Sequence, residues 1–153
     1  MKRIEVKLSL SVVAPLLDVI KSLSDTMGRK LSAPLAIADL DPEFRDDWMA
    51  ELLEAQTSDV GVLLALFDDE FFSEGVIALD EKNAEPVVRA CAAVRLRLRE
   101  NYLKGIADET LESSDLELEE LEEPVRKAFM CYLFLATLQE LIIQHLDSTI
   151  LEG

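Results

Sequence analysis

The chain has 153 residues, of which half are hydrophobic, and its 31 acidic and 15 basic side chains give a formal net charge of −16. This length suits a single domain over residues 1–153, with a core large enough to need no disulfide framework. So negative a chain repels phosphate backbones, which argues against nucleic acid as a partner and would steer basic partners toward it.

The N-terminal residues predict a strand followed by a helix. Residues 3–10, "RIEVKLSL", alternate apolar and polar side chains, which is typical of a half-buried strand. The start lacks the long apolar run and cleavage site of a signal peptide, so we expect a cytoplasmic protein. The next stretch predicts a helix that ends near Met27–Gly28, with a core face formed by Val12, Leu16, Val19, Ile20 and Leu23.

A longer helical pattern follows a loop-like stretch at 28–41. Asp41 is the predicted N-cap and Pro42 the first helical residue. The pattern runs to about residue 74, where Gly75 can end it, and "TSDVG" (57–61) would kink or split it. The residues expected to face the core are Phe44, Trp48, Leu52, Val60, Leu63, Leu64, Phe67 and Phe71.

The second half predicts one more strand and two helices. "VIAL" (76–79) is too short for a helix and predicts a strand that pairs with 3–10. Helices are expected at about 82–107 and 124–147, separated by the acidic run 108–123. The last helix is apolar nearly all round, which places it in the middle of the domain. The predicted fold class is mainly α, a helical bundle around a buried C-terminal helix with a small two-stranded β-ribbon.

The sequence lacks the motifs of common catalytic and cofactor sites. His145 is its one histidine, too few for a zinc or di-iron site, and its five glycines form no phosphate-binding loop. Cys91 and Cys131 lie in apolar helical patterns, as buried free thiols do. We therefore expect no metal, no cofactor and no catalytic residues, although enzymatic activity is not excluded. Polar residues interrupt the last apolar stretch, so no membrane segment is expected.

Three arginines in "RLRLR" (95–99) stand out in so acidic a chain. At about 100° per residue, Arg95 and Arg99 point into the apolar stripe of their helix, while Arg97 points to solvent. A buried guanidinium needs an acceptor, and we expect Glu140 to accept hydrogen bonds from Arg99 or, failing that, Arg95. Such a cluster either lines a pocket for a ligand or peptide or fixes helix register as a buried ion pair. Its predicted members are Arg95, Arg99, Glu140, Gln139 and Tyr132.

The last helix also carries a family resemblance. With "EFR" at 43–45 and the arginine helix, "YLFLATLQEL" (132–141) resembles an uncharacterised bacterial domain-of-unknown-function family whose C-terminal helix reads Tyr-x-Trp-Leu-x-x-Leu-Gln-Glu. Phe134 stands where that family has Trp. The residues that match the motif are Tyr132, Leu135, Leu138, Gln139 and Glu140. In some bacteria the family's gene lies beside that for ClpS, the adaptor of the Clp protease, which implies a cytoplasmic accessory role near regulated proteolysis.

Two classes of function remain open. One is a non-catalytic interaction or regulatory module, whose protein partner the sequence does not identify. The other is a small-molecule or anion-binding protein, or an enzyme, that uses Arg95 and Arg99 in a polar pocket. An excess of apolar residues, including Phe71, Phe72 and Ile150–Leu151, also predicts a homodimer.

Overall fold

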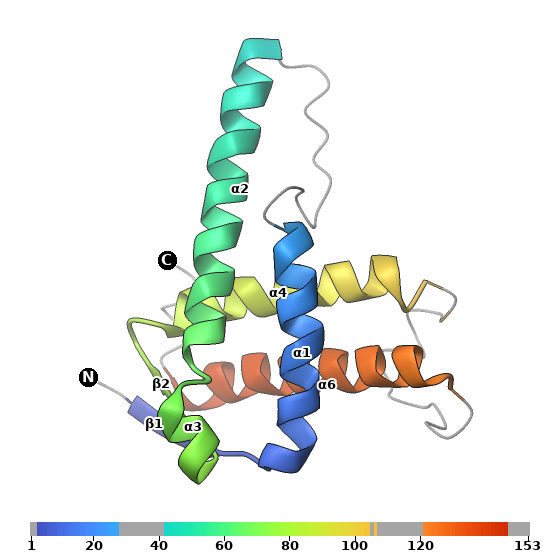
Figure 1. The fold of residues 1–153 in the computed structure, drawn as a ribbon. Coiled ribbons are helices and arrows are strands. Elements are labelled where there is room, and N and C mark those ends of the chain that lie inside the picture. The colour runs from blue at the N-terminus through green and yellow to red at the C-terminus, as the bar shows by residue number, and fades with distance from the viewer. Residues whose placement is uncertain (1–2, 28–41, 105, 107–120, 147–153) are drawn as a thin grey trace.

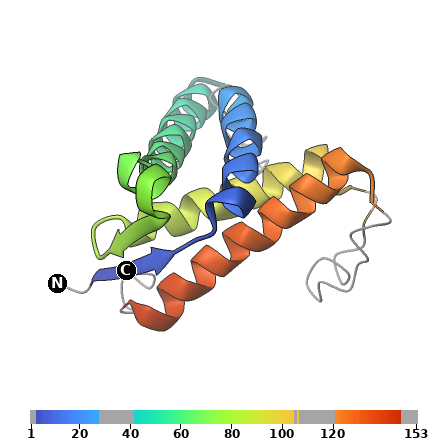
Figure 2. The same ribbon diagram turned by 60° about the horizontal axis from the view of Figure 1, so that its bottom comes forward.

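The computed structural model describes residues 3–27, 42–104, 106 and 121–146 (Figure 1). In the two views, helices α4 (Ala84–Asn101) and α6 (Glu123–His145) run side by side in opposite directions. Helices α1 (Leu10–Met27) and α2 (Pro42–Ala65) cross them as a second layer (Figures 1 and 2). This arrangement confirms the predicted helical fold with a small β-ribbon. In chain order the elements are β1 (Arg3–Lys7), α1 (Leu10–Met27), α2 (Pro42–Ala65), α3 (Asp69–Glu74), β2 (Val76–Asp80), α4 (Ala84–Asn101) and α6 (Glu123–His145).

The ribbon has the predicted pairing. β1 is antiparallel to β2, with Arg3 opposite Asp80 and Lys7 opposite Val76. β1 is shorter than the predicted strand, because α1 already begins at Leu10. Between them, the Leu8 N–H makes one last bond to the Gly75 carbonyl (2.7 Å). Gly75 has a φ of 73°, and a Cβ there would lie 2.7 Å from the Leu8 oxygen, so this junction requires glycine.

A side-chain amide occupies part of the outer edge of β2. Asn83 Nδ2 donates to the Ala78 carbonyl (3.1 Å), and Asn83 Oδ1 accepts from the Asp80 N–H (2.9 Å). The bond between Leu8 and Gly75 fixes which residues face β1, so the edge groups of Ala78 and Asp80 point away from it. Asn83 therefore makes the bonds that a third strand would make, which protects this edge from strand addition.

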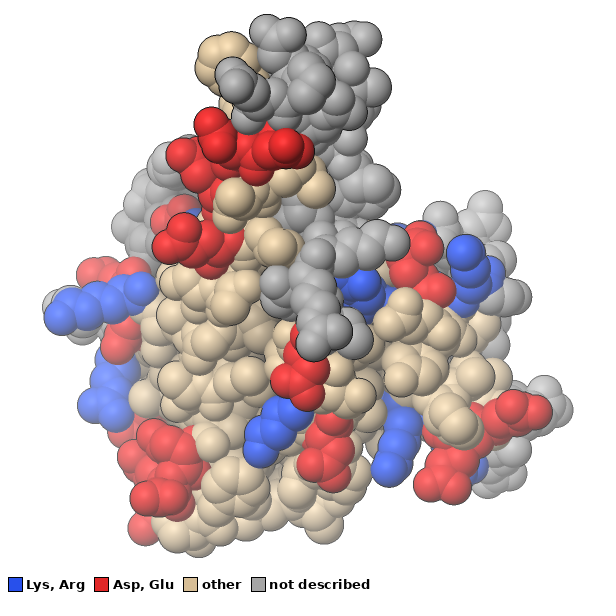
Figure 3. All heavy atoms as spheres, turned by 45° about the horizontal axis from the view of Figure 1, so that its top comes forward, with Lys and Arg blue, Asp and Glu red and all other residues tan. Residues whose placement is uncertain are grey.

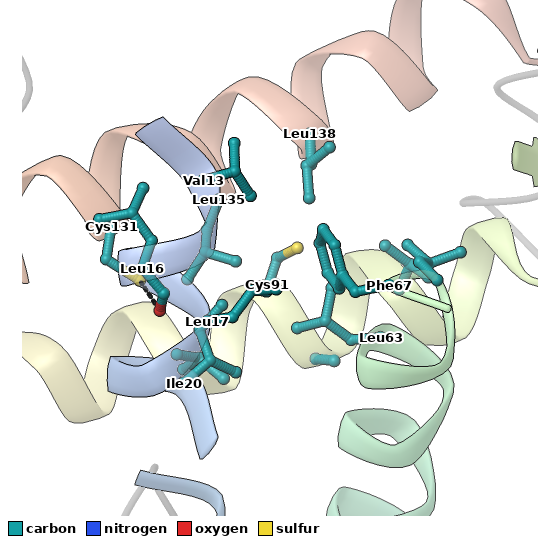
Figure 4. Close-up of a cluster of buried hydrophobic side chains, with 14 of the residues drawn as sticks. Val13, Leu16, Leu17, Ile20, Leu63, Phe67, Cys91, Cys131, Leu135 and Leu138 are labelled. Carbon is teal, nitrogen blue, oxygen red and sulfur yellow. Dashed lines mark hydrogen bonds between the residues drawn. The ribbon is translucent and has the colours of Figure 1, made fainter. Parts of the chain in front are cut away.

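The core lies between the two helical layers (Figure 4), where side chains of α1, α2, α4 and α6 converge. On α1 the buried stripe differs from the prediction: Val12 is exposed, and Val13 and Leu17 join Leu16 and Ile20 in the core. The cause is that α1 packs against both α2 and α6, so the buried face is centred between these neighbours.

The long helical pattern from 42 to 74 divides into α2 and α3, but later than "TSDVG". Leu66 N–H donates to the Leu63 carbonyl (3.2 Å), a tightened last turn that ends α2. Asp68 then caps α3 by accepting from the Phe71 N–H (3.2 Å), and Gly75 ends α3 as predicted. The predicted N-cap Asp41 lies outside the described residues.

α6 packs against α4 and α1 and supplies much of the core, but it is not enclosed on every side, because Ile143 is half exposed. Among the helices in the described part of the chain, α6 alone is long and apolar enough to cross a membrane. That is weak evidence for a membrane segment, since core helices of soluble proteins share both properties.

Candidate functional site

Three of the predicted cluster residues meet between α4 and α6. Arg95 Nη1 donates to Gln139 Oε1 at 2.8 Å, and its guanidinium carbon lies 4.3 Å from the centre of the Tyr132 ring. Gln139 Nε2 in turn donates to the Val88 carbonyl at 3.1 Å. The amide thus bridges a side chain and the backbone of the neighbouring helix.

Helical spacing explains why these groups meet. Val88 and Arg95 are two turns apart on α4, and Tyr132 and Gln139 are two turns apart on α6. Because the helices are antiparallel, Val88 lies near Gln139 while Arg95 also reaches back to Tyr132. The contacts therefore define the register of one helix against the other.

The predicted role of Glu140 is wrong. Glu140 is exposed, and Gln144 Nε2 contacts its carboxylate at 3.5 Å. One residue along a helix turns the side chain by about 100°, so Gln139 faces α4 and Glu140 does not. Arg99, one turn beyond Arg95, is partly buried.

The predicted exposure of Arg97 is also wrong, because only 9% of this residue is exposed. The expectation treated the side of α4 away from α6 as solvent-facing. In the structure α2 and α1 also pack on α4, and its exposed stripe runs through Ala92, Leu96 and Glu100, not through Arg97.

An ion pair at the α2–α4 contact uses another arginine. Arg89 binds Asp59 of α2 with two bonds, Nε to Oδ2 at 3.0 Å and Nη2 to Oδ1 at 3.1 Å. Its Nη1 also donates to Glu85 at 2.6 Å, and hydrogen bonding to Asp59 raises the pKa of Arg89. Half of the Arg89 side chain is exposed, so the pair contributes more to geometry than to stability.

Two surface grooves are lined by described residues. One, about 380 Å³, lies between the ribbon and the α2–α3 junction, where Asp68 and Asp80 accept backbone N–H groups of their own turns. The other, about 360 Å³, lies between α1, the end of α4 and the start of α6, with Asp18, Tyr102 and Lys127 on its walls. The residues that line these two grooves do not include Arg95, Gln139 or Tyr132.

The two cysteines are buried free thiols, as their patterns indicate. Burial raises the pKa of both Cys91 and Cys131 to about 12, so neither is a thiolate at neutral pH. Cys131 points its sulfur toward the Leu16 carbonyl (Figure 4), at 4.0 Å. Within the ranges that the structure describes, no three Asp, Glu, His or Cys side chains gather as a metal site would require.

The first half of α2 presents large apolar side chains to solvent. Phe44 is 68% exposed and Trp48 52%, which corrects the prediction that both face the core. We call residues 44–55 the projecting segment, because α2 rises here well past the end of α1 and far above α4, which runs across the view (Figure 1). None of its described side chains is buried, and Val60 is the first buried residue among those described in α2.

Acidic side chains surround these apolar residues. Asp46, Asp47, Glu51 and Glu54 are all exposed, and Figure 3 shows acidic groups gathered over the upper part of α2. The sequence pattern predicts a core-facing helix here, and the structure corrects this prediction. The missed signal was the density of acids, since residues 43–54 contain five acids and one arginine. The projecting segment therefore combines apolar area with negative charge, as a protein-binding surface can.

Comparison with known proteins identifies a family. The family model described as "Domain of unknown function (DUF2017)" matches residues 21–146, which include α2, α4 and α6. The chain therefore belongs to this family, as its resemblance implied. Neither the curated proteins nor the solved structures give a match.

Proposed function

We propose that this member of the DUF2017 family is a non-catalytic interaction module that binds a partner protein through the projecting segment of α2. The observation that carries the proposal is the exposure of Phe44 and Trp48 on a helix end that stands clear of the core. Trp and other large aromatic side chains dominate binding energy at protein interfaces, because they lose much solvent-exposed area on contact.

The energetics of the free helix support the same proposal. A helix of about twelve residues without tertiary packing is marginal in water, and the projecting segment spans only about 18 Å. Its packing support comes from the second half of α2, where Asp59 pairs with Arg89 and Val60 enters the core. A partner that covers the exposed side chains of the segment would supply packing that the other described residues do not.

The alternative, an anion or small-molecule site at Arg95 and Arg99, has weaker support. Arg95 is held by Gln139 and stacks on Tyr132, so its guanidinium already has protein partners. A partly buried structural cluster that sets helix register accounts for these contacts without a ligand. The family resemblance adds the proposal that the partner acts near regulated proteolysis.

The test uses a photo-crosslinking amino acid at position 48, in cells that contain the full chain. Phe72 on α3 is the matched control, because it is 50% exposed against 52% for Trp48. We expect position 48 to give a discrete adduct with a different protein, whereas position 72 should give none except with a second copy of this chain. The adduct protein, once purified, should bind Trp48→Ala at least tenfold more weakly than the unsubstituted chain.

Stability measurements separate binding from folding in this test. Trp48 is half exposed, so Trp48→Ala should change the free energy of unfolding by less than about 0.5 kcal/mol. Capture of the same partner protein at positions 48 and 72, or unchanged affinity of Trp48→Ala, would contradict the proposed function.

A further inference from the structure

We propose that the partner of the projecting segment is an amphipathic helix that carries lysine or arginine beside its apolar stripe. This inference rests on the proposed function and names the chemistry of the partner. It is drawn from the order of apolar and acidic positions around α2.

Phe44, Trp48 and Leu52 form an apolar ridge along the projecting segment. They are spaced four residues apart, so each lies about 6 Å further along the helix and slightly round it. Phe44 and Trp48 are exposed and Leu52 is partly buried, so the ridge runs from solvent down to the body of the protein. A ridge of this spacing fits the groove between side chains of a second helix.

Asp47, Glu51 and Glu54 form an acidic ridge beside the apolar one. All three are exposed, and at about 100° per residue they share a side adjacent to Phe44 and Trp48. Asp47 and Glu51 are one turn apart, where like charges repel. Lysine or arginine side chains of a partner would relieve this repulsion, while apolar side chains of the same partner cover Trp48.

A second copy of the chain fits this surface poorly. Two projecting segments laid together would oppose acidic ridges, in a chain whose formal net charge is already −16. An anionic lipid surface is disfavoured for the same reason. Strand addition would need a different surface, and Asn83 occupies part of the β2 edge. A basic amphipathic helix satisfies both ridges at once.

The experiment uses the intact protein and a synthetic eighteen-residue peptide of leucine and lysine with its leucines at helical spacing. Trp48 is the only tryptophan, so its emission reports directly on the surface. We expect a saturable blue shift with this peptide. Neither a peptide of the same composition with a scrambled leucine pattern nor a leucine–glutamate peptide should produce one.

Matched charge variants test the acidic ridge. Asp47→Asn/Glu51→Gln/Glu54→Gln removes three charges from the ridge and should weaken the leucine–lysine peptide about tenfold. Glu70→Gln/Glu74→Gln/Glu140→Gln removes three exposed charges elsewhere, so affinity should fall less than threefold. Phe44→Ala keeps every charge and should also weaken binding about tenfold, which separates apolar contact from charge alone.

Each contrary result overturns the inference in a distinct way. Equal weakening by both charge variants would mean that only the net charge matters. A blue shift with the leucine–glutamate peptide, with lipid vesicles, or with rising protein concentration alone would point to a different occupant. A crosslinked partner at position 48 without binding of the basic peptide would contradict this inference but not the proposed function. Failure of both experiments would contradict both.

Discussion

The contact between Gln139 and Arg95 leads to a sharp prediction about two adjacent residues of α6. Gln139 faces α4 and joins Arg95 to the Val88 carbonyl. Glu140 is exposed, and its carboxylate accepts a hydrogen bond from Gln144. Gln139→Leu keeps a similar volume and removes both bonds. Glu140→Gln keeps the shape and removes a charge. The two variants therefore separate the observed cluster from the one that the sequence predicts.

The magnitudes follow from the partners. A hydrogen bond to a charged group contributes about 1.5–3 kcal/mol, and the Val88 carbonyl keeps its helical donor when the amide is lost. We expect Gln139→Leu to lower the free energy of unfolding by about 2–3 kcal/mol. Glu140→Gln should change it by less than about 0.5 kcal/mol, as exposed substitutions do.

Urea unfolding followed by far-ultraviolet circular dichroism measures both values. Helix signal is the appropriate probe, because Trp48 is exposed in the folded chain and its emission should change little on unfolding. A loss of about 3 kcal/mol or more for Glu140→Gln would mean that this carboxylate holds a buried arginine, as the sequence predicts. A loss below about 0.5 kcal/mol for Gln139→Leu would show that the bridge does not stabilise the α4–α6 contact.

Three further predictions concern other parts of the chain. In chemical unfolding, Gly75→Ala should cost at least about 2 kcal/mol, because of its left-handed backbone and the nearby Leu8 oxygen, whereas Gly61→Ala, in open space on α2, should stabilise by about 0.5–1 kcal/mol. Burial raises the pKa of the Cys91 and Cys131 thiols from 9.0 to about 12, so their contribution to stability is complete below pH 9 and falls as pH rises toward 12. A Cys91→Ala/Cys131→Ala variant should lack that part of the decline when unfolding is measured across this range. If the predicted homodimer forms through Phe72, Phe72→Asp should produce monomers in sedimentation, and a monomeric unsubstituted chain at micromolar concentration would contradict the dimer.

The ribbon could be predicted from sequence because two independent signals agreed. Residues 3–10 alternate with period two, and "VIAL" is confined between Gly75 and Asp80. A run of four residues with such boundaries has few options besides a short strand. Of the apolar residues that predict a homodimer, Phe72 is exposed but Phe71 lies in the core, and Ile150–Leu151 lie outside the described residues.

The polar cluster could be predicted only in part. The need of Arg95 for a partner on α6 followed from its place in an apolar stripe, and Gln139 and Tyr132 are indeed beside it. Charge alone favoured Glu140 over Gln139 as the acceptor. A helical projection of one helix leaves the rotation of its neighbour undetermined, and one residue of rotation decides which of two adjacent side chains faces inward.

The exposure of the first half of α2 could not be read from an apolar pattern, for a reason that bears on its function. When the helix is projected at 100° per residue, Phe44 and Trp48 point on average about 110° away from the mean direction of Val60 and Leu63. Leu52 projects about 50° from that direction and lies between the two faces. The core stripe, continued toward the start of α2, would pass through other positions. The exposed aromatic residues are therefore not an overhang of the core face. They form a separate face on the same helix, which allows a partner to cover the projecting segment without competing for the residues that hold α2 to the domain.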